Sequence, residues 1–329
     1  MIIDLGKLIE KGITSINRDF FTETNSVSEL HIIQKSNMDI PFSIDSNLIE
    51  NLINLKVLSL NFLSLEDGDI SFIQNNDNLE NLQILSDFRK HELQINLDQN
   101  LPSKITNLYL RLHSRNEYEP LMDRINKKLV EEFRLSYSNN FSIQPYLDFE
   151  NIRVLNLSGC GSLIDFEKLE LLQNKNLVSL SLSELDEYNE NDPKHVDGQI
   201  PNSGFPDVKL HLPNLKVLYF PLDRDYFPEN FISDCPKLEY LNVFHHDLAS
   251  YSVELDLQVL DHPSLKYLKI PDFTYLPKPE NLERIVNHPR VKSGEVMLSE
   301  VEEGVVQEAP EELEKMYQQL LTPVFRDFY

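Results

Sequence analysis

His245, His246 and Asp247 form the group of adjacent residues whose types come closest to a metal-binding set. Consecutive residues of an extended strand point to opposite faces, so the two imidazoles need not reach the same ion. We therefore interpret this group as the turn that ends a strand, and we predict no metal site there.

Two cysteines, Cys160 and Cys235, lie 75 residues apart and show neither a disulfide framework nor the spacing of a zinc site. We interpret each as a small core or turn residue rather than a nucleophile. The chain also lacks the glycine-rich phosphate-binding, zinc-protease and nucleophile-elbow motifs. The sequence therefore predicts no enzyme, no catalytic residue and no bound cofactor.

The charge balance narrows the class of partner. Asp and Glu number 54 and Lys and Arg number 30, which gives a formal net charge of −24. Such a chain repels phosphate backbones and anionic membranes, so we expect neither nucleic acid nor a lipid surface as a partner. A protein partner that is basic or of mixed charge is favoured.

With no signal peptide recognised and only two thiols, we expect a cytoplasmic or nuclear protein.

The most informative feature is an apolar pattern, L-x-x-L-x-L, that recurs along the chain with large apolar residues allowed at each L. Eight of the nine intervals between successive copies lie between 22 and 28 residues. A fixed period of this length is the signature of a repeat protein. A weak eleventh copy begins at Val291 and ends at Leu298. The ten clear copies begin at Val27, Leu55, Leu79, Ile105, Val130, Ile152, Leu177, Leu215, Leu238 and Leu265.

These copies must position any binding residue. In each copy the last apolar residues alternate with polar ones, which indicates a strand buried on one face. A single strand cannot bury itself, so we expect stacked copies to form a parallel sheet. The returning segments predict short helices, at 165–172 and 280–286 and near 228–232. The predicted fold is an α/β solenoid with a curved parallel sheet on its concave side and short helices and loops on its convex side.

The run from Leu155 to Cys160 and the joints at 234–241 and 261–268 resemble leucine-rich repeats, in particular those of F-box proteins and ribonuclease-inhibitor-like proteins. The resemblance covers roughly residues 25–298, and no F-box is recognised beside it. It implies a protein-binding scaffold. It also implies an alternative, a substrate-recognition subunit of a cullin-type ubiquitin ligase, for which a ligase adaptor would be a partner.

The organisation along the chain has three parts. We predict an N-terminal cap at residues 1–26, a repeat solenoid at 27–298, and an acidic C-terminal segment at 299–329. The one long interval between copies, 38 residues, predicts a loop insertion near 186–206. The C-terminal segment contains a helical pattern between Pro310 and Leu321, which would be either a cap or a docking helix for a partner.

The candidate partner-binding site lies on the concave face of the last three repeats. The repeat pattern directs their polar-position side chains out of the sheet, where we expect them to be exposed, and several of these are aromatic. Tyrosine and phenylalanine are favoured anchors in protein interfaces. Two alternatives remain: cross-strand stacking of the aromatic residues, and coverage by the C-terminal helix. The predicted site consists of Tyr219, Tyr240, Asn242, Phe244, Tyr267 and Lys269.

Overall fold

The structure is a computed structural model. It describes residues 1–21, 26–34, 42–62, 70–86, 100–112, 121–136, 148–158, 173–182, 209–221, 226–227, 229–244, 254–255, 257–269 and 279–299.

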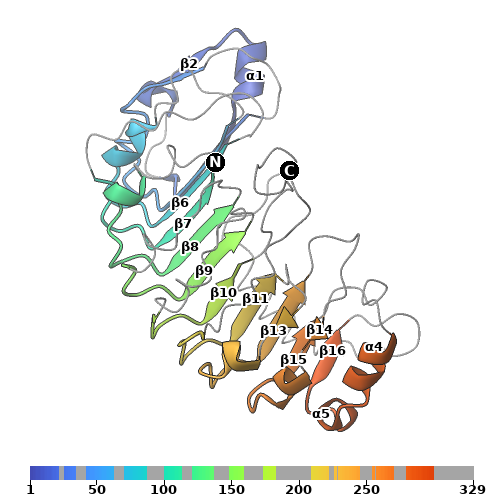
Figure 1. The fold of residues 1–329 in the computed structure, drawn as a ribbon. Coiled ribbons are helices and arrows are strands. Elements are labelled where there is room, and N and C mark those ends of the chain that lie inside the picture. The colour runs from blue at the N-terminus through green and yellow to red at the C-terminus, as the bar shows by residue number, and fades with distance from the viewer. Residues whose placement is uncertain are drawn as a thin grey trace, which may run out of the picture. The chain divides into compact units, whose positions relative to one another are not determined.

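Parallel strands dominate this described part of the chain (Figure 1). Each predicted repeat contributes one strand, so the predicted parallel sheet is confirmed. Twelve strands belong to the sheet, and every pairing between them that is resolved is parallel. In spatial order they are β1 (Ile2–Asp4), β3 (Glu29–Ile33), β5 (Val57–Phe62), β6 (Asn81–Ser86), β7 (Asn107–Arg111), β8 (Glu132–Ser136), β9 (Val154–Ser158), β10 (Ser179–Ser181), β11 (Val217–Pro221), β13 (Tyr240–Phe244), β15 (Tyr267–Lys269) and β16 (Met297–Ser299).

The chain divides into two compact units. The first unit carries the strands from β1 to β8, and the second carries those from β9 to β16. Strand register is the same in both units, because the leucine in the middle of each pattern lies opposite its counterpart. Leu58 faces Leu82 in the first unit, and Leu180 faces Leu218 in the second.

The core of each unit lies on the inner face of its strands. The apolar residues of the repeat pattern point there, and Leu58, Leu155 and Leu218 are 0% exposed. Their burial follows from the two-residue period of a strand, which sends every second side chain to the same face. The opposite face carries the intervening residues. We call it the outer face, and it is the face that the sequence predicts to be concave.

Short helices and turns connect the strands. The predicted helix at 280–286 is confirmed as α4 (Pro279–Val286), and Pro279 at its start has no amide hydrogen to leave unpaired. The segment near 228–232 forms a 3-10 helix, Glu229–Ile232, and the predicted helix at 165–172 lies outside the described residues. The remaining elements are α1 (Leu5–Glu10), α5 (Pro289–Lys292), the 3-10 helices Arg18–Phe20, Ser71–Asn75 and Leu257–Asp261, and two small parallel sheets that pair β2 (Ser15–Ile16) with β4 (Ser43–Ile44) and β12 (Tyr226–Phe227) with β14 (Glu254–Leu255).

The two ends of the repeat region differ in detail from the expectation. Residues 1–26, predicted as an N-terminal cap, contribute strand β1 to the sheet before helix α1, and Ile3 pairs with Ile32. The eleventh copy contains strand β16, but Val291 lies in α5 instead of starting the repeat. Strand β16 still keeps the register of the sheet, because Leu298 lies opposite Leu268 on β15.

This combination of a long parallel sheet, a fixed strand register and short returning helices is an α/β leucine-rich-repeat solenoid. The predicted insertion at 186–206 and residues 300–329 lie outside the described residues. Among the helices that the structure describes, none has the length and apolar character needed to cross a bilayer.

Candidate interaction surface

The predicted aromatic site forms part of a row of side chains across four strands of the second unit. Val217, Tyr240, Tyr267 and Met297 occupy equivalent positions on β11, β13, β15 and β16, so each lies directly opposite the next. We call these four residues the apolar row. The rings of Tyr240 and Tyr267 are 4.6 Å apart between centroids with an angle of 30° between their planes. This separation is at the close end of the range for attractive contacts between aromatic rings.

The prediction that these tyrosines are exposed is wrong. Tyr240 is 1% exposed and Tyr267 is 2% exposed, and Val217 beside them is fully buried. Neighbouring strands are only about 4.8 Å apart, so a large side chain on either side removes the flanks of each ring from water. The apolar row is therefore a packed cluster on the outer face rather than an open patch.

Tyr219 does not continue the row of the other two tyrosines. It lies opposite Asn242, which in turn lies opposite Lys269, so these three residues form a second row two residues further along the strands. Tyr219 still packs against the apolar row from this position. Tyr219 and Lys269 are partly exposed, whereas Asn242 is buried. Phe244 lies at the end of β13 opposite Pro221, in a third row.

The outer face of the first unit is polar by contrast. The Ser59 hydroxyl lies 2.5 Å from Gln83 Oε1, and Asn107 Nδ2 donates to Asn81 Oδ1 at 2.6 Å, so amides and hydroxyls pair across neighbouring strands. Arg134 is buried on the same face, 3.6 Å from the carboxylate of Glu132. Burial lowers the pKa of the Arg134 guanidinium, and the Glu132 charge partly offsets that effect. The apolar row has no counterpart among the described residues of this unit.

Several residues that the apolar pattern does not single out lie at the edge where the strands begin. Asn78, Asn151 and Asn214 each stand immediately before the first apolar residue of a repeat. Each donates its side-chain amide to a carbonyl of the preceding repeat, at 2.9, 2.7 and 2.6 Å respectively. A lysine of the following repeat then donates to the oxygen of two of these amides, Lys104 to Asn78 at 2.8 Å and Lys237 to Asn214 at 2.6 Å.

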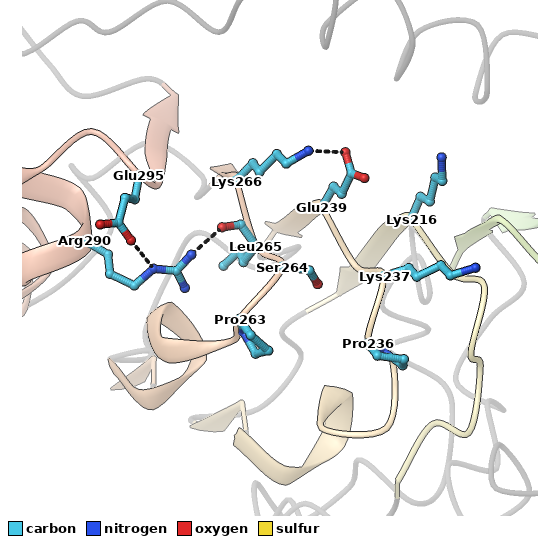
Figure 2. Close-up of a pocket in the computed structure, with 10 residues that line it drawn as sticks. All are labelled: Lys216, Pro236, Lys237, Glu239, Pro263, Ser264, Leu265, Lys266, Arg290 and Glu295. Carbon is cyan, nitrogen blue, oxygen red and sulfur yellow. Dashed lines mark hydrogen bonds and ion pairs between the residues drawn. The ribbon is translucent and has the colours of Figure 1, made fainter.

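The same edge holds a pocket of about 630 Å³ in the second unit (Figure 2). The residues that precede β11, β13 and β15, namely Lys216, Glu239 and Lys266, line it side by side. Arg290 and Glu295 close one end of it, 3.2 Å apart. The signal that could have found this pocket is the repeated presence of lysine next to the first apolar residue of a repeat, at Lys56, Lys104, Lys216, Lys237 and Lys266.

Cys235 and His262 occupy the same position in successive repeats, three residues before the first apolar residue, and Asn76 occupies it in the first unit. All three are buried, and Cys235 and Asn76 contact a carbonyl of the preceding repeat. The Cys235 thiol lies 3.4 Å from Leu210 O, and the Asn76 amide donates to Ile49 O at 3.1 Å. Burial raises the pKa of Cys235 to about 12 and lowers the pKa of His262 below its ordinary value.

Cys235 is therefore a core residue, as predicted. Cys160 and the group His245, His246 and Asp247 lie outside the described residues. Within the part of the chain that the structure describes, no group of three His, Cys, Asp or Glu side chains is placed to hold a metal ion.

Comparisons with known proteins give structural similarity without sequence similarity. No protein-family model and no curated protein matches the sequence. A chain in the structure of the Toll–Spatzle complex, described as a molecular hub in Drosophila development and innate immunity, aligns over 80% of this chain and 33% of its own length, with 15% identity and a TM-score of 0.51. The chain thus spans about a third of that protein.

Two further structures are similar at lower scores. An internalin of Listeria monocytogenes aligns over 83% of this chain and 80% of its own, with 14% identity and a TM-score of 0.42. A leucine-rich-repeat protein of Leptospira interrogans aligns over 90% of this chain and 98% of its own, with 15% identity and a TM-score of 0.30. At these identities the comparisons describe the fold alone, and the two structures with a TM-score below 0.5 add no argument to the solenoid fold described above.

Proposed function

We propose that this protein is a non-catalytic interaction scaffold that binds a partner protein through the outer face of its C-terminal repeats. The site consists of Tyr219, Tyr240, Asn242, Phe244, Tyr267 and Lys269. Tyr219 and Lys269 make the first contacts, because their side chains are partly exposed. Tyr240 and Tyr267 form a floor against which Tyr219 packs.

The observation that carries this proposal is the position of the apolar row. Its side chains belong to the outer face, away from the leucine core that the fold needs. At the equivalent positions of the first unit Val57 is flanked by Glu29 and Asn81, so no continuous apolar row forms among its described residues. Packed tyrosines form a rigid floor, and Tyr219 presents a phenol beside it with little side-chain entropy left to lose. An interface of this kind combines an aromatic anchor with a cation, Lys269, at its side.

The partner we propose is a protein of basic or mixed charge. The net charge of −24 raises the rate of encounter with positive surfaces and lowers it with nucleic acid. Neither an enzymatic activity nor a cofactor is part of the proposal, because binding through the outer face requires neither.

Site-specific photo-crosslinking tests the proposal with a matched control. A photoreactive phenylalanine analogue replaces Tyr219 in one sample and Tyr109 in another; both residues follow the middle leucine of their repeat and both are partly exposed. Irradiation in extract of the native cell should give the same crosslinked protein repeatedly from position 219 and not from position 109. Equal crosslinking at the two positions, or a crosslinked partner that still binds the double variant Tyr219→Ala with Lys269→Ala unchanged, contradicts the proposal.

A separate experiment tests the ligase alternative. A direct binding assay with the purified adaptor subunit of a cullin-type ligase gives a saturable signal if the chain is a substrate receptor. Binding of the adaptor would replace the plain scaffold with that alternative. Absence of adaptor binding, together with a partner crosslinked at Tyr219, leaves the scaffold as the function.

A further inference from the structure

The pocket at the beginning of β11, β13 and β15 is the feature that carries an inference beyond the outer face. It lies at the edge of the sheet and is separate from the candidate site. Its lining includes four cations and two carboxylates in a chain whose net charge is −24. Pro236 and Pro263 form its base, and the charged side chains extend above them (Figure 2).

Two of the four cations already have partners. Arg290 Nε lies 3.2 Å from Glu295, and the Arg290 guanidinium donates to Leu260 O at 2.8 Å and Leu265 O at 3.0 Å. This arginine therefore holds the chain at the end of the pocket. Lys266 Nζ lies 3.0 Å from the Glu239 carboxylate, a distance that satisfies both charges.

The other two cations, Lys216 and Lys237, retain uncompensated charge. Lys237 donates to the neutral amide oxygen of Asn214, which leaves its positive charge unbalanced. Within the described part of the chain, Lys216 has no carboxylate partner. The two lysines extend from the same end of the pocket, away from the Arg290–Glu295 pair (Figure 2).

The same edge in the first unit shows why Lys216 is different. Lys56 has the equivalent position, and it pairs with Glu80 of the next repeat at 2.9 Å. Glu239 is the equivalent of Glu80, but Lys266 takes its carboxylate from the other side. The sequence of the second unit thus supplies one carboxylate for two flanking lysines and leaves Lys216 available.

The backbone at this edge does not form a phosphate cradle. The amide hydrogens of Glu239 and Tyr240 both go to Lys216 O, at 3.0 Å each, and those of Lys216 and Val217 both go to Val178 O. A phosphate site built from backbone amides or a helix start is therefore not available here. Lysine ammonium groups act as separate point charges on flexible stems, which suits carboxylates spaced along a chain.

We propose that this pocket docks an acidic peptide segment of a partner protein, with a glutamate or aspartate carboxylate held between Lys216 and Lys237. The methylene groups of the segment lie over Pro236 and Pro263. A partner that uses this pocket and the outer face together is of mixed charge, acidic where it meets the edge and basic elsewhere. The pocket is tested without reference to the outer face, so each proposal stands or fails by itself.

Fluorescence anisotropy with a labelled oligoglutamate peptide tests the docking. We expect saturable binding to the full chain at low ionic strength, and weakening as salt screens the exposed charges. The double variant Lys216→Glu with Lys237→Glu should weaken binding at least about tenfold, because both uncompensated charges are reversed. A labelled oligolysine peptide should bind elsewhere on the chain, and its binding should not weaken in this double variant.

The matched control is Lys56→Glu with Lys104→Glu. These residues occupy the same repeat positions in the first unit, Lys104 makes the same contact with its asparagine as Lys237, and the net charge changes by the same amount. The control should keep most of the binding. Equal loss in the two double variants would assign the effect to net charge alone and overturn the proposal.

Three further results would also overturn the proposal. The first is failure of oligoglutamate to bind the unmodified chain. The second is full displacement of the peptide by inorganic phosphate where sodium chloride of the same ionic strength does not displace it, which would make the pocket a simple anion site. The third is a dimer of the chain that dissociates in the Lys216→Glu, Lys237→Glu variant, which would make a second copy the occupant. Circular dichroism confirms folding of each variant, and Lys216→Ala, which introduces no new charge, should reproduce part of the loss.

Discussion

Tyr240 and Tyr267 lie directly opposite each other on β13 and β15, with their rings in contact and both side chains almost completely buried on the outer face. Their burial makes them part of the stability of the second unit as well as the floor of the proposed interface.

Replacing either tyrosine of this pair should destabilise the protein. We expect Tyr240→Ala or Tyr267→Ala to lower the free energy of unfolding by about 3 kcal/mol, since a large buried ring is lost and a cavity remains. Tyr219→Ala is the control, because that ring is partly exposed, and its cost should be clearly smaller. Chemical denaturation measures all three. A loss for Tyr240→Ala within about 0.5 kcal/mol of zero, the range of surface sites, would contradict its burial.

The middle leucines of the repeat pattern should be among the most sensitive positions. Leu155→Ala and Leu218→Ala should each cost about 2–5 kcal/mol, because both side chains are fully buried between neighbouring repeats. Ile53→Ala makes a suitable comparison, since Ile53 is 58% exposed in the turn that precedes β5. Urea titration of the three variants provides the measurement. If the leucine substitutions proved no more costly than Ile53→Ala, the assignment of the leucines to the inner face would be wrong.

Cys235 should resist thiol reagents in the native protein. Its folded-state pKa of about 12 lies above the ordinary value of 9.0, chiefly because burial penalises the thiolate. Between pH 9 and 12 the unfolded chain loses this proton while the native chain keeps it, so stability declines as the pH rises through that window. Mass spectrometry after alkylation should show Cys235 labelled only on unfolding. The decline in stability should be shallower in Cys235→Ala; an identical slope would contradict the shift.

His262 should make the protein sensitive to acid. Burial is the main cause of its lowered pKa, and the nearby charge of Arg290 adds to the effect. Below the ordinary value of 6.5 the unfolded chain binds a proton that the native chain does not, so stability is lost as the pH falls.

The variant His262→Asn provides the test, because asparagine fills the same repeat position at Asn76, where its amide donates to carbonyls of the preceding repeat. Thermal unfolding from neutral to mildly acidic pH should show a smaller decrease in the midpoint for this variant than for the unmodified chain. His31 is also buried with a lowered pKa, so part of the acid sensitivity should remain. A pH profile unaffected by the substitution would assign the sensitivity elsewhere.

The repeat positions could be predicted from the sequence because a leucine pattern records which face of a strand is buried. Leu155 and Leu218 illustrate this, since both lie where the pattern places them. Exposure on the outer face could not be predicted the same way. The environment of Tyr240 depends on Val217 and Tyr267, which are brought beside it only by pairing across strands.

Two further features, the offset of Tyr219 and the lysine pocket, could not be predicted for the same reason, since both depend on pairing across strands. Tyr219 follows the middle leucine of its repeat, whereas Tyr240 precedes it, so the two tyrosines fall in different rows despite their similar spacing. Lys216 differs from Lys56 only in what the following two repeats supply, because Lys266 competes for Glu239. Charge compensation of this kind is a property of three neighbouring repeats and is not visible in any one of them.

The shared strand register has a consequence for how such a chain can change in length. In most of the described repeats the carbonyl before the strand accepts two amide hydrogens from the next repeat, as Lys216 O does from Glu239 and Tyr240. A genetic duplication or deletion of one whole repeat restores the same joint, because any repeat presents the same donors and acceptor. A deletion that shifts a strand by a single residue turns its leucines outward and its polar residues inward. Recombination can therefore add or remove strands only in complete repeats, whereas the returning segments, whose lengths differ from repeat to repeat, can change by single residues.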